Sequence, residues 1–220
     1  MKYSCVLFDM DGVLYDSMPL HAEAWIKAMH SFGIEMTAHE AYMTEGQRGI
    51  DTIRQMVREQ QGRTITEQEA QAMYDEKARL FHLNPKAPIF DGVVDLMKRL
   101  KADGMAICIV TGSAQRPLIQ RLTDDFGAFV DPRHIVTAYD VSHGKPHPEP
   151  YLKGLQKAGA TAGIVIENAP MGIRAGVAAG CRTIAVNSGP LADDILLAEH
   201  PHRLYHSIRE VERDWNQIIL

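Results

Sequence analysis

The stretch Cys5-Val6-Leu7-Phe8-Asp9-Met10-Asp11-Gly12 decides the fold class. Its first half is apolar, and its second half places two carboxylates two residues apart in front of a glycine. A short, continuously apolar run is typical of a strand that is covered on both faces, as in a parallel sheet. Gly12 allows a sharp turn after such a strand. We therefore expect a buried strand that delivers Asp9 and Asp11 to one edge of a sheet.

Similar apolar or β-branched runs recur along the chain and alternate with helical patterns. We expect strands at residues 6–8, 105–110, 134–137, 163–166 and 183–186. Asp91 can cap a helix that ends before Gly104, and Pro170 can open a helix that ends before Gly180. Alternation of strand and helix predicts an α/β fold with a doubly wound parallel sheet.

Residues 18–85 interrupt this alternation, because they contain no convincing strand. Apolar residues of the 18–29 segment recur at helical spacing, and the segments 49–61 and 66–83 are charged and helical. We expect a four-helix insertion, closed by the proline-containing linker 84–88. The domains would then be a core of residues 1–17 and 86–220 and a helical cap of residues 18–85. Such a cap would cover the carboxyl ends of the strands, where ligands bind in these folds.

The composition argues against certain partners of the protein. The chain has 220 residues, 45% of them hydrophobic and 23% charged, and a net charge of −5 without a basic cluster. We therefore expect no nucleic-acid partner. The first residues enter an apolar run without a leader pattern, and no run approaches the ~20 residues that span a bilayer. We expect neither a signal peptide nor a membrane span.

The three cysteines, Cys5, Cys108 and Cys181, lie far apart in apolar segments. Reduced, buried thiols of a cytoplasmic protein fit this pattern. No clustered zinc ligands stand out, so the sequence predicts no zinc site.

We expect a monomer.

Asp9 and Asp11 would repel each other unless a cation lies between them. A hard divalent cation with oxygen ligands meets this need, which predicts a Mg²⁺ site. A calcium loop is an alternative for Asp-x-Asp-Gly, but it needs more oxygen ligands and a closing Glu. Only Asp16 and Ser17 are available, and Leu20 occupies the closing position.

Three further motifs follow later apolar runs. In the first, the Thr111 hydroxyl and the backbone bared by Gly112 can hold phosphoryl oxygens, with Ser113 next to them. The second places Lys145 between Gly144 and Pro146, and the third is Glu167-Asn168. Taken singly, the first motif also fits an ordinary loop, the second a solvated lysine and the third a helix cap.

Together and in this order, the motifs resemble those of the haloacid dehalogenase (HAD) superfamily, in its β-phosphoglucomutase-like branch. The resemblance covers essentially the whole chain. It implies that Asp9 attacks phosphorus and forms an aspartyl-phosphate, and that Asp11 acts as general acid and base. Thr111 would hold the transferring phosphoryl group, and Lys145 would neutralise its charge.

The same resemblance implies the metal ligands and the contacts made by the cap. Asp9, the backbone carbonyl of Asp11 and Asn168 would bind Mg²⁺, and Glu167 would hold a metal-bound water. Asn168 departs from the commoner Asp and removes one negative charge. Ser113 of the Thr111 motif and three residues of the insertion would bind the substrate or time its proton transfer; the three are Arg48, Lys77 and His21.

Glu45 bears on the choice of substrate, since it could restore the missing charge from the cap. Glu45 combined with Asn168 resembles the inorganic-pyrophosphatase-type members of the branch. We therefore expect a small phosphorylated substrate, with pyrophosphate favoured and the leaving phosphate held by Arg48 and Lys77. A hexose-phosphate mutase and a broad sugar-phosphate phosphatase remain alternatives.

Two readings outside this enzyme class are weaker. A phosphate-binding protein without activity would be expected to lack Asp9, Asp11 or Lys145, and all three are present. A receiver domain also has a phosphorylatable aspartate after a parallel strand, but it would be about half as long and without the helical insertion.

Overall fold

A computed structural model describes residues 2–220 of the chain. Within these residues, six parallel strands form one sheet in the order β3-β2-β1-β4-β5-β6. The strands are β1 (Cys5–Phe8), β2 (Ala106–Val110), β3 (Ile135–Val136), β4 (Gly163–Glu167), β5 (Arg182–Val186) and β6 (Arg203–Tyr205). Since β1 lies between β2 and β4, its carboxyl end opens at the centre of the sheet edge. The predicted doubly wound α/β fold is confirmed.

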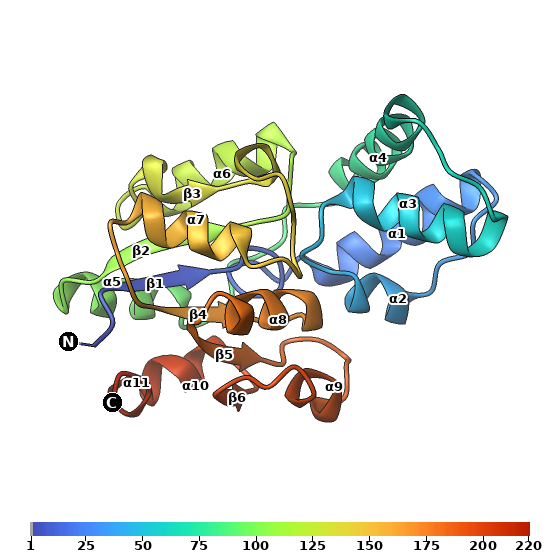
Figure 1. The fold of residues 1–220 in the computed structure, drawn as a ribbon. Helices are drawn as coiled ribbons and strands as arrows, with labels where there is room; N and C mark the ends of the chain where they lie inside the picture. The colour runs from blue at the N-terminus through green and yellow to red at the C-terminus, as the bar shows by residue number, and fades with distance from the viewer. Residues whose placement is uncertain (1) are drawn as a thin grey trace.

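Helices cover both faces of the sheet (Figure 1). They are α5 (Val93–Ala102), α6 (Arg116–Phe126), α7 (Glu149–Lys157), α8 (Pro170–Ala178), α9 (Asp193–Leu197), α10 (Ile208–Arg213) and α11 (Trp215–Ile218), with 3₁₀ turns at Pro132–His134 and Ala138–Asp140. Val6 and Phe8 of β1 pack into one apolar cluster with α5 and α10, whereas Leu7 packs into another with Tyr151 of α7. Both faces of β1 are therefore buried, which explains its unbroken apolar sequence.

The helical insertion after β1 is present. It consists of α1 (Met18–Ser31), α2 (Ala38–Met43), α3 (Gly49–Gln61) and α4 (Glu67–His82). Capping boxes at Thr37 and Thr66 begin α2 and α4. The side chains of Met29 and Ile53 are fully buried in the apolar cluster of the insertion. Figure 1 shows these helices gathered beyond the carboxyl ends of the strands.

Some local predictions were wrong. Gly92, with a φ of 89°, is the N-cap of α5, and the carboxylate of Asp91 instead pairs with Arg209 at 2.6 Å. Residues 132–134 form a 3₁₀ turn capped by Asp131, which shortens the predicted strand to two residues. Strand β6 was not predicted, because it has three residues at the edge of the sheet.

Other expectations held. Helix α8 runs from Pro170 to Ala178, and α5 ends before Gly104, as predicted. Cys5, Cys108 and Cys181 are buried free thiols. No helix within residues 2–220 combines the length and the apolar character that a membrane span requires.

Candidate active site

The carboxyl ends of three neighbouring strands meet at one edge of the sheet. Asp9 follows β1, and its N–H donates to the Ile166 carbonyl of β4 at 3.0 Å. Thr111 follows β2, and its N–H donates to the Val136 carbonyl of β3 at 2.9 Å. Glu167 ends β4. The parallel register therefore brings these side chains together from distant parts of the sequence.

Lys145 lies at the centre of this edge, although it belongs to none of the strands. Its Nζ donates to Asp9 Oδ1, to Glu167 Oε1 at 2.7 Å and to the Val110 carbonyl at 3.2 Å. Burial disfavours the charged ammonium of Lys145, but the negative charges of Asp9 and Glu167 outweigh this effect and raise its pKa. Burial also raises the pKa of Asp9, against the opposing charge of Lys145. A further cation beside Asp9 would therefore favour its ionised form.

Glu167, which was expected to hold a metal-bound water, is surrounded by donors of the protein itself. Its Oε1 accepts from Lys145 and from the Tyr151 hydroxyl at 2.9 Å, and its Oε2 accepts from the backbone N–H groups of Asn168 at 2.8 Å and Ala169 at 3.0 Å. A carboxylate offers about four acceptor sites. The donors around Glu167 fill them, so Glu167 anchors Lys145 in this arrangement.

A chain of polar contacts joins the core to the insertion. Asp11 Oδ1 accepts from Ser17 Oγ at 2.6 Å and lies 3.0 Å from His21 Nε2, while His21 Nδ1 lies 2.7 Å from Lys77 Nζ. These partners fix the tautomer: Nε2–H donates to Asp11, and Nδ1 accepts from the ammonium. Burial opposes ionisation of Asp11, but His21 and Ser17 lower its pKa overall. Phe81 stacks on His21 with ring centroids 4.0 Å apart.

The loop after α2 brings Glu45 to the same place. A Cβ at Gly112 would lie 2.6 Å from the Gly46 carbonyl oxygen, so the loop packs directly on the core and requires glycine there. Burial and the charge of Asp11 raise the pKa of Glu45 to about 7, against the opposing charges of Lys77 and Lys145. Glu45 therefore belongs to the electrostatic cluster of the site. Burial in turn lowers the pKa of Lys77 to about 8.

These groups surround a cavity of about 30 Å³, whose lining includes Asp11, His21, Glu45, Lys77, Thr111 and Ser113. Thr111 Oγ1 accepts from the Ser113 N–H at 3.0 Å, and Ser113 Oγ accepts from the Gln115 N–H at 3.2 Å. Each hydroxyl keeps its own proton for donation to a ligand oxygen. The arrangement suits an anion whose oxygens meet hydroxyl and ammonium donors.

Comparison with known proteins agrees with this geometry. The family model for haloacid dehalogenase-like hydrolases matches residues 3–180. The chain belongs to this family. It is 31% identical to hexitol phosphatase A of Escherichia coli K12 over 194 residues, which cover 86% of this chain and 85% of that protein. It is 31% identical to glycerol-1-phosphate phosphohydrolase 2 of Saccharomyces cerevisiae over 202 residues, covering 84% and 75%.

A solved structure from Bacteroides vulgatus, provisionally named a β-phosphoglucomutase, superposes with a TM-score of 0.94. It is 44% identical and covers 99% of this chain and 89% of its own. The chain is thus an enzyme of the HAD phosphatase or phosphomutase type. Members of this superfamily generally use Mg²⁺.

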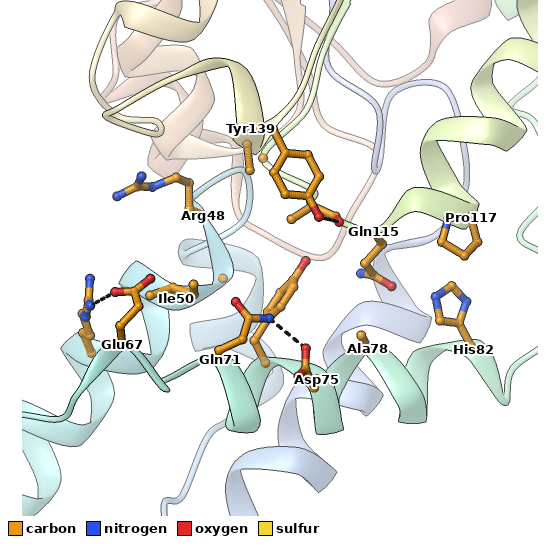
Figure 2. Close-up of a pocket in the computed structure, with 16 residues that line it drawn as sticks. Arg48, Ile50, Glu67, Gln71, Asp75, Ala78, His82, Gln115, Pro117 and Tyr139 are labelled. Atoms are coloured by element: carbon orange, nitrogen blue, oxygen red, sulfur yellow. Dashed lines mark hydrogen bonds and ion pairs between the residues drawn. The ribbon is translucent and has the colours of Figure 1, made fainter. Parts of the chain in front are cut away.

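In this HAD enzyme, Arg48 does not line the small cavity, although it was expected to hold the leaving phosphate. Its guanidinium pairs with Asp51 through contacts of 2.7 and 3.0 Å in the first turn of α3. Arg48 instead lines an adjoining cavity of about 470 Å³ between α4 and residues 112–117. Figure 2 shows Arg48 at the rim of this cavity, away from Gln115. The local acid therefore holds the side chain that was expected to grip a phosphate.

The residues present fit a hard divalent cation. Asn168 Oδ1 is buried and has no hydrogen-bond partner among residues 2–220. A Cβ at Gly12 would lie 2.1 Å from Asn168 Nδ2, so glycine is required for Asn168 to reach this position. Asp9, Asn168 and Glu45 carry side-chain oxygens, and Asp11 a backbone carbonyl, that such an ion could take as ligands. Oxygen donors are the ligands that Mg²⁺ prefers.

Tyr151 was missed by the sequence analysis. Its hydroxyl contacts Glu167, and Lys145 Nζ lies 5.1 Å from the centre of its ring. It stands six residues after Lys145, in α7. An aromatic residue in a buried helix looks like core, so only the tertiary contact identifies its link to the site.

Proposed function

We propose that this chain is a Mg²⁺-dependent phosphohydrolase that works through an aspartyl-phosphate on Asp9. The observation that carries the proposal is the placement of Asp9 against Lys145 at the carboxyl edge of the sheet, with Asp11 and Thr111 beside it. A buried carboxylate held by an ammonium is a nucleophile in position, and the adjacent hydroxyl can hold the phosphoryl oxygens.

The reaction would have two displacements at phosphorus. In the first, an Asp9 oxygen attacks, the bond to the leaving oxygen breaks, and that oxygen takes its electron pair and the proton of Asp11. In the second, the Asp11 carboxylate takes a proton from water, whose oxygen attacks phosphorus and releases Asp9. His21 and Ser17 hold Asp11 in place for both steps.

Mg²⁺ would be held by the Asp9 carboxylate, the Asp11 carbonyl, Asn168 Oδ1 and Glu45. Bound there, it would offset the negative charge of the phosphoryl oxygens. The free Asn168 Oδ1 and the location of Glu45 near Asp11 support this ligand set. Glu167 is left out of the first coordination sphere, because the protein's own donors occupy it.

We infer that inorganic pyrophosphate is the favoured substrate. The cavity beside Asp11 is small, and the insertion loop closes over it. Lys77 provides a cation for the leaving phosphate. Arg48 could provide a second cation only if its guanidinium left Asp51 and bound the phosphate instead.

A small sugar or polyol phosphate is the second candidate, with hydrolysis or mutase transfer as the outcome. The relatives named as hexitol and glycerol-1-phosphate phosphatases favour it. The larger cavity supports it as well, since it shares Tyr74, Gly112 and Gln115 with the small one and offers room for an organic group.

We further propose that residues 18–85 form a cap that moves against a core of residues 1–17 and 86–220. The contact of Gly46 and Gln47 with Gly112 would then represent the closed state. Free buried thiols favour a cytoplasmic location. A monomeric state stays a prediction.

The test is phosphate release with Mg²⁺ from pyrophosphate, glycerol 1-phosphate, a hexitol phosphate and β-glucose 1-phosphate, with Asp9→Asn as control. We expect preference for pyrophosphate and loss of activity in the variant. Faster release from the polyol phosphates would move the assignment to the second candidate. Conversion of β-glucose 1-phosphate to glucose 6-phosphate with little free phosphate would make the enzyme a mutase.

A further inference from the structure

The turn that carries Lys145 is flanked by a group of metal-ligating side chains. His143, His147 and Glu149 each offer a ligand atom, and these atoms lie within 4.8 Å of one another. The sequence predicted no zinc site, because no set of clustered ligands was recognised in it. This group was overlooked, although its three residues lie close together in the chain.

Hydrogen bonds hold the group in place. Glu149 accepts from the backbone N–H groups of Ser142 at 2.7 Å and His143 at 2.9 Å, and its Oε2 lies 2.9 Å from His143 Nδ1. The Glu149 N–H donates to His147 Nδ1 at 3.2 Å, and the two imidazole rings are 4.7 Å apart. The backbone thus fixes the carboxylate, and both rings lie beside it.

The donor set selects a class of ion. Two imidazoles and one carboxylate suit Zn²⁺ and its neighbours among the transition metals, whereas Mg²⁺ prefers oxygen ligands alone. Tetrahedral zinc bonded at about 2 Å separates its ligand atoms by roughly 3.3 Å. The side chains of His143 and His147 are 67% and 51% exposed, so their rings can rotate to close the remaining gap.

The position of the group ties it to the catalytic lysine. His143 and His147 lie two residues to either side of Lys145, and the His147 N–H donates to the Gly144 carbonyl at 3.0 Å across the turn. A Cβ at Gly144 would lie 2.7 Å from Arg48 Cγ, so the loop that leads into α3 packs on the same turn. A metal that draws the two imidazoles together would act on the backbone that aims Lys145 at Asp9.

We propose that His143, His147 and Glu149 form a binding site for a divalent transition-metal ion of the zinc class, whose occupancy lowers turnover by displacing Lys145. The binding half of the proposal stands on these three side chains alone. The inhibitory half rests on the proposed function, because it requires Lys145 to act at Asp9.

The experiment titrates the full chain with Zn²⁺ by calorimetry, with Mg²⁺ at saturating concentration to fill the oxygen-lined site. His143→Ala and His147→Ala are compared with His39→Ala, which removes an exposed histidine on α2. Loss of one imidazole should weaken Zn²⁺ binding at least about tenfold, since even the loss of an outer-shell partner has that effect. The His39→Ala variant should bind like wild type. Equal Zn²⁺ affinity in wild type and in both cluster variants would overturn the site.

The second arm measures phosphate release in the same buffers, with each protein's activity expressed relative to its own value without Zn²⁺. Wild type and His39→Ala should lose activity as Zn²⁺ fills the calorimetric site, and the cluster variants should keep it. Wild-type activity that stays constant across that range would overturn the link to Lys145. Since the calorimetry needs no turnover, failure of the proposed function would be visible separately.

Discussion

Lys145 Nζ lies 2.7 Å from Glu167 Oε1, and neither side chain has more than 1% of its surface exposed. The same ammonium also contacts Asp9. One cation therefore holds two buried carboxylates that would otherwise repel each other. Removing one partner of a buried ionic group leaves uncompensated charge in a medium that solvates it poorly.

Replacement of this cation should damage both stability and activity. We expect Lys145→Met to lower the free energy of unfolding by about 3–5 kcal/mol, the usual cost of breaking a buried ion pair. Turnover should fall by at least about 10²-fold, the scale of removing one preorganised donor. Urea denaturation and phosphate release measure the two effects. Lys101→Met, at an exposed position, should change neither, and a Lys145→Met protein of wild-type stability would contradict the arrangement.

Tyr151 should act as a positioning residue through Glu167. Tyr151→Phe removes one of the donors to that carboxylate, which should cost about 1–3 kcal/mol of stability. Because Lys145 then loses part of its anchor, kcat should fall while KM changes little. Tyr15→Phe is the matched control, since its hydroxyl also donates to a carboxylate, that of Asp125 at 2.8 Å, but outside the site; it should lose comparable stability and keep its kcat. Equal kinetics for the two variants would remove Tyr151 from the catalytic scheme.

Glu45 should give the metal-free protein a characteristic dependence of stability on pH. Its pKa is raised from the ordinary 4.5 to about 7, so between these values the folded chain keeps a proton that the unfolded chain has released. The contribution of Glu45 to stability therefore falls as the pH rises through this range. We expect metal-free Glu45→Gln to be more stable than wild type at pH 8 and equal to it near pH 4.

Thermal unfolding at several pH values measures this difference, and Glu59→Gln provides an exposed control on α3. Addition of Mg²⁺ at pH 8 should stabilise wild type more than Glu45→Gln, because the carboxylate would then have its cation. The same pH profile for wild type and Glu45→Gln would show that Glu45 does not belong to the site's charge cluster.

Asn168 should set the requirement for Mg²⁺. Asn168→Ala removes the buried Oδ1 that has no partner among the described residues, 2–220. The Mg²⁺ concentration for half-maximal activity should rise at least about tenfold, which is the lower end of losses for groups near a metal. Asn168→Asp keeps a ligand oxygen and should need no more Mg²⁺ than wild type. Unchanged Mg²⁺ dependence in Asn168→Ala would exclude Asn168 as a ligand.

The sequence was sufficient for the buried part of the fold. Strands β1, β2, β4 and β5 are covered on both faces, so their apolar runs are continuous and easy to recognise. Strand β6 lies at the edge of the sheet as Arg203-Leu204-Tyr205, with only Tyr205 buried, and leaves no such run. The N-cap of α5 was misplaced because Arg209, more than a hundred residues away, takes the carboxylate of Asp91.

The candidate site, too, could be predicted from the sequence only in part. Asp9, Asp11 and Asn168 could be placed because the carboxyl ends of parallel strands must meet at one edge. Lys145 lies in a turn outside the strands, and only the resemblance of its motif placed it. Side-chain partners could not be predicted, since they depend on packing. Asp51 captures Arg48 and the donors around Glu167 saturate it, so neither residue has the surroundings that its motif suggested.

The central claim is that Asp9 becomes phosphorylated during turnover. Acid-quenched reactions with pyrophosphate and Mg²⁺, followed by mass spectrometry of the peptide that contains Asp9, test it most directly. We predict a phosphoryl adduct on Asp9 that forms within one turnover in wild type. It should accumulate in Asp11→Ala, because phosphate can leave pyrophosphate without the acid, whereas the second displacement needs the base. Asp9→Asn should show neither adduct nor turnover. Hydrolysis by Asp9→Asn at a rate near that of wild type, with no adduct in either protein, would contradict the account.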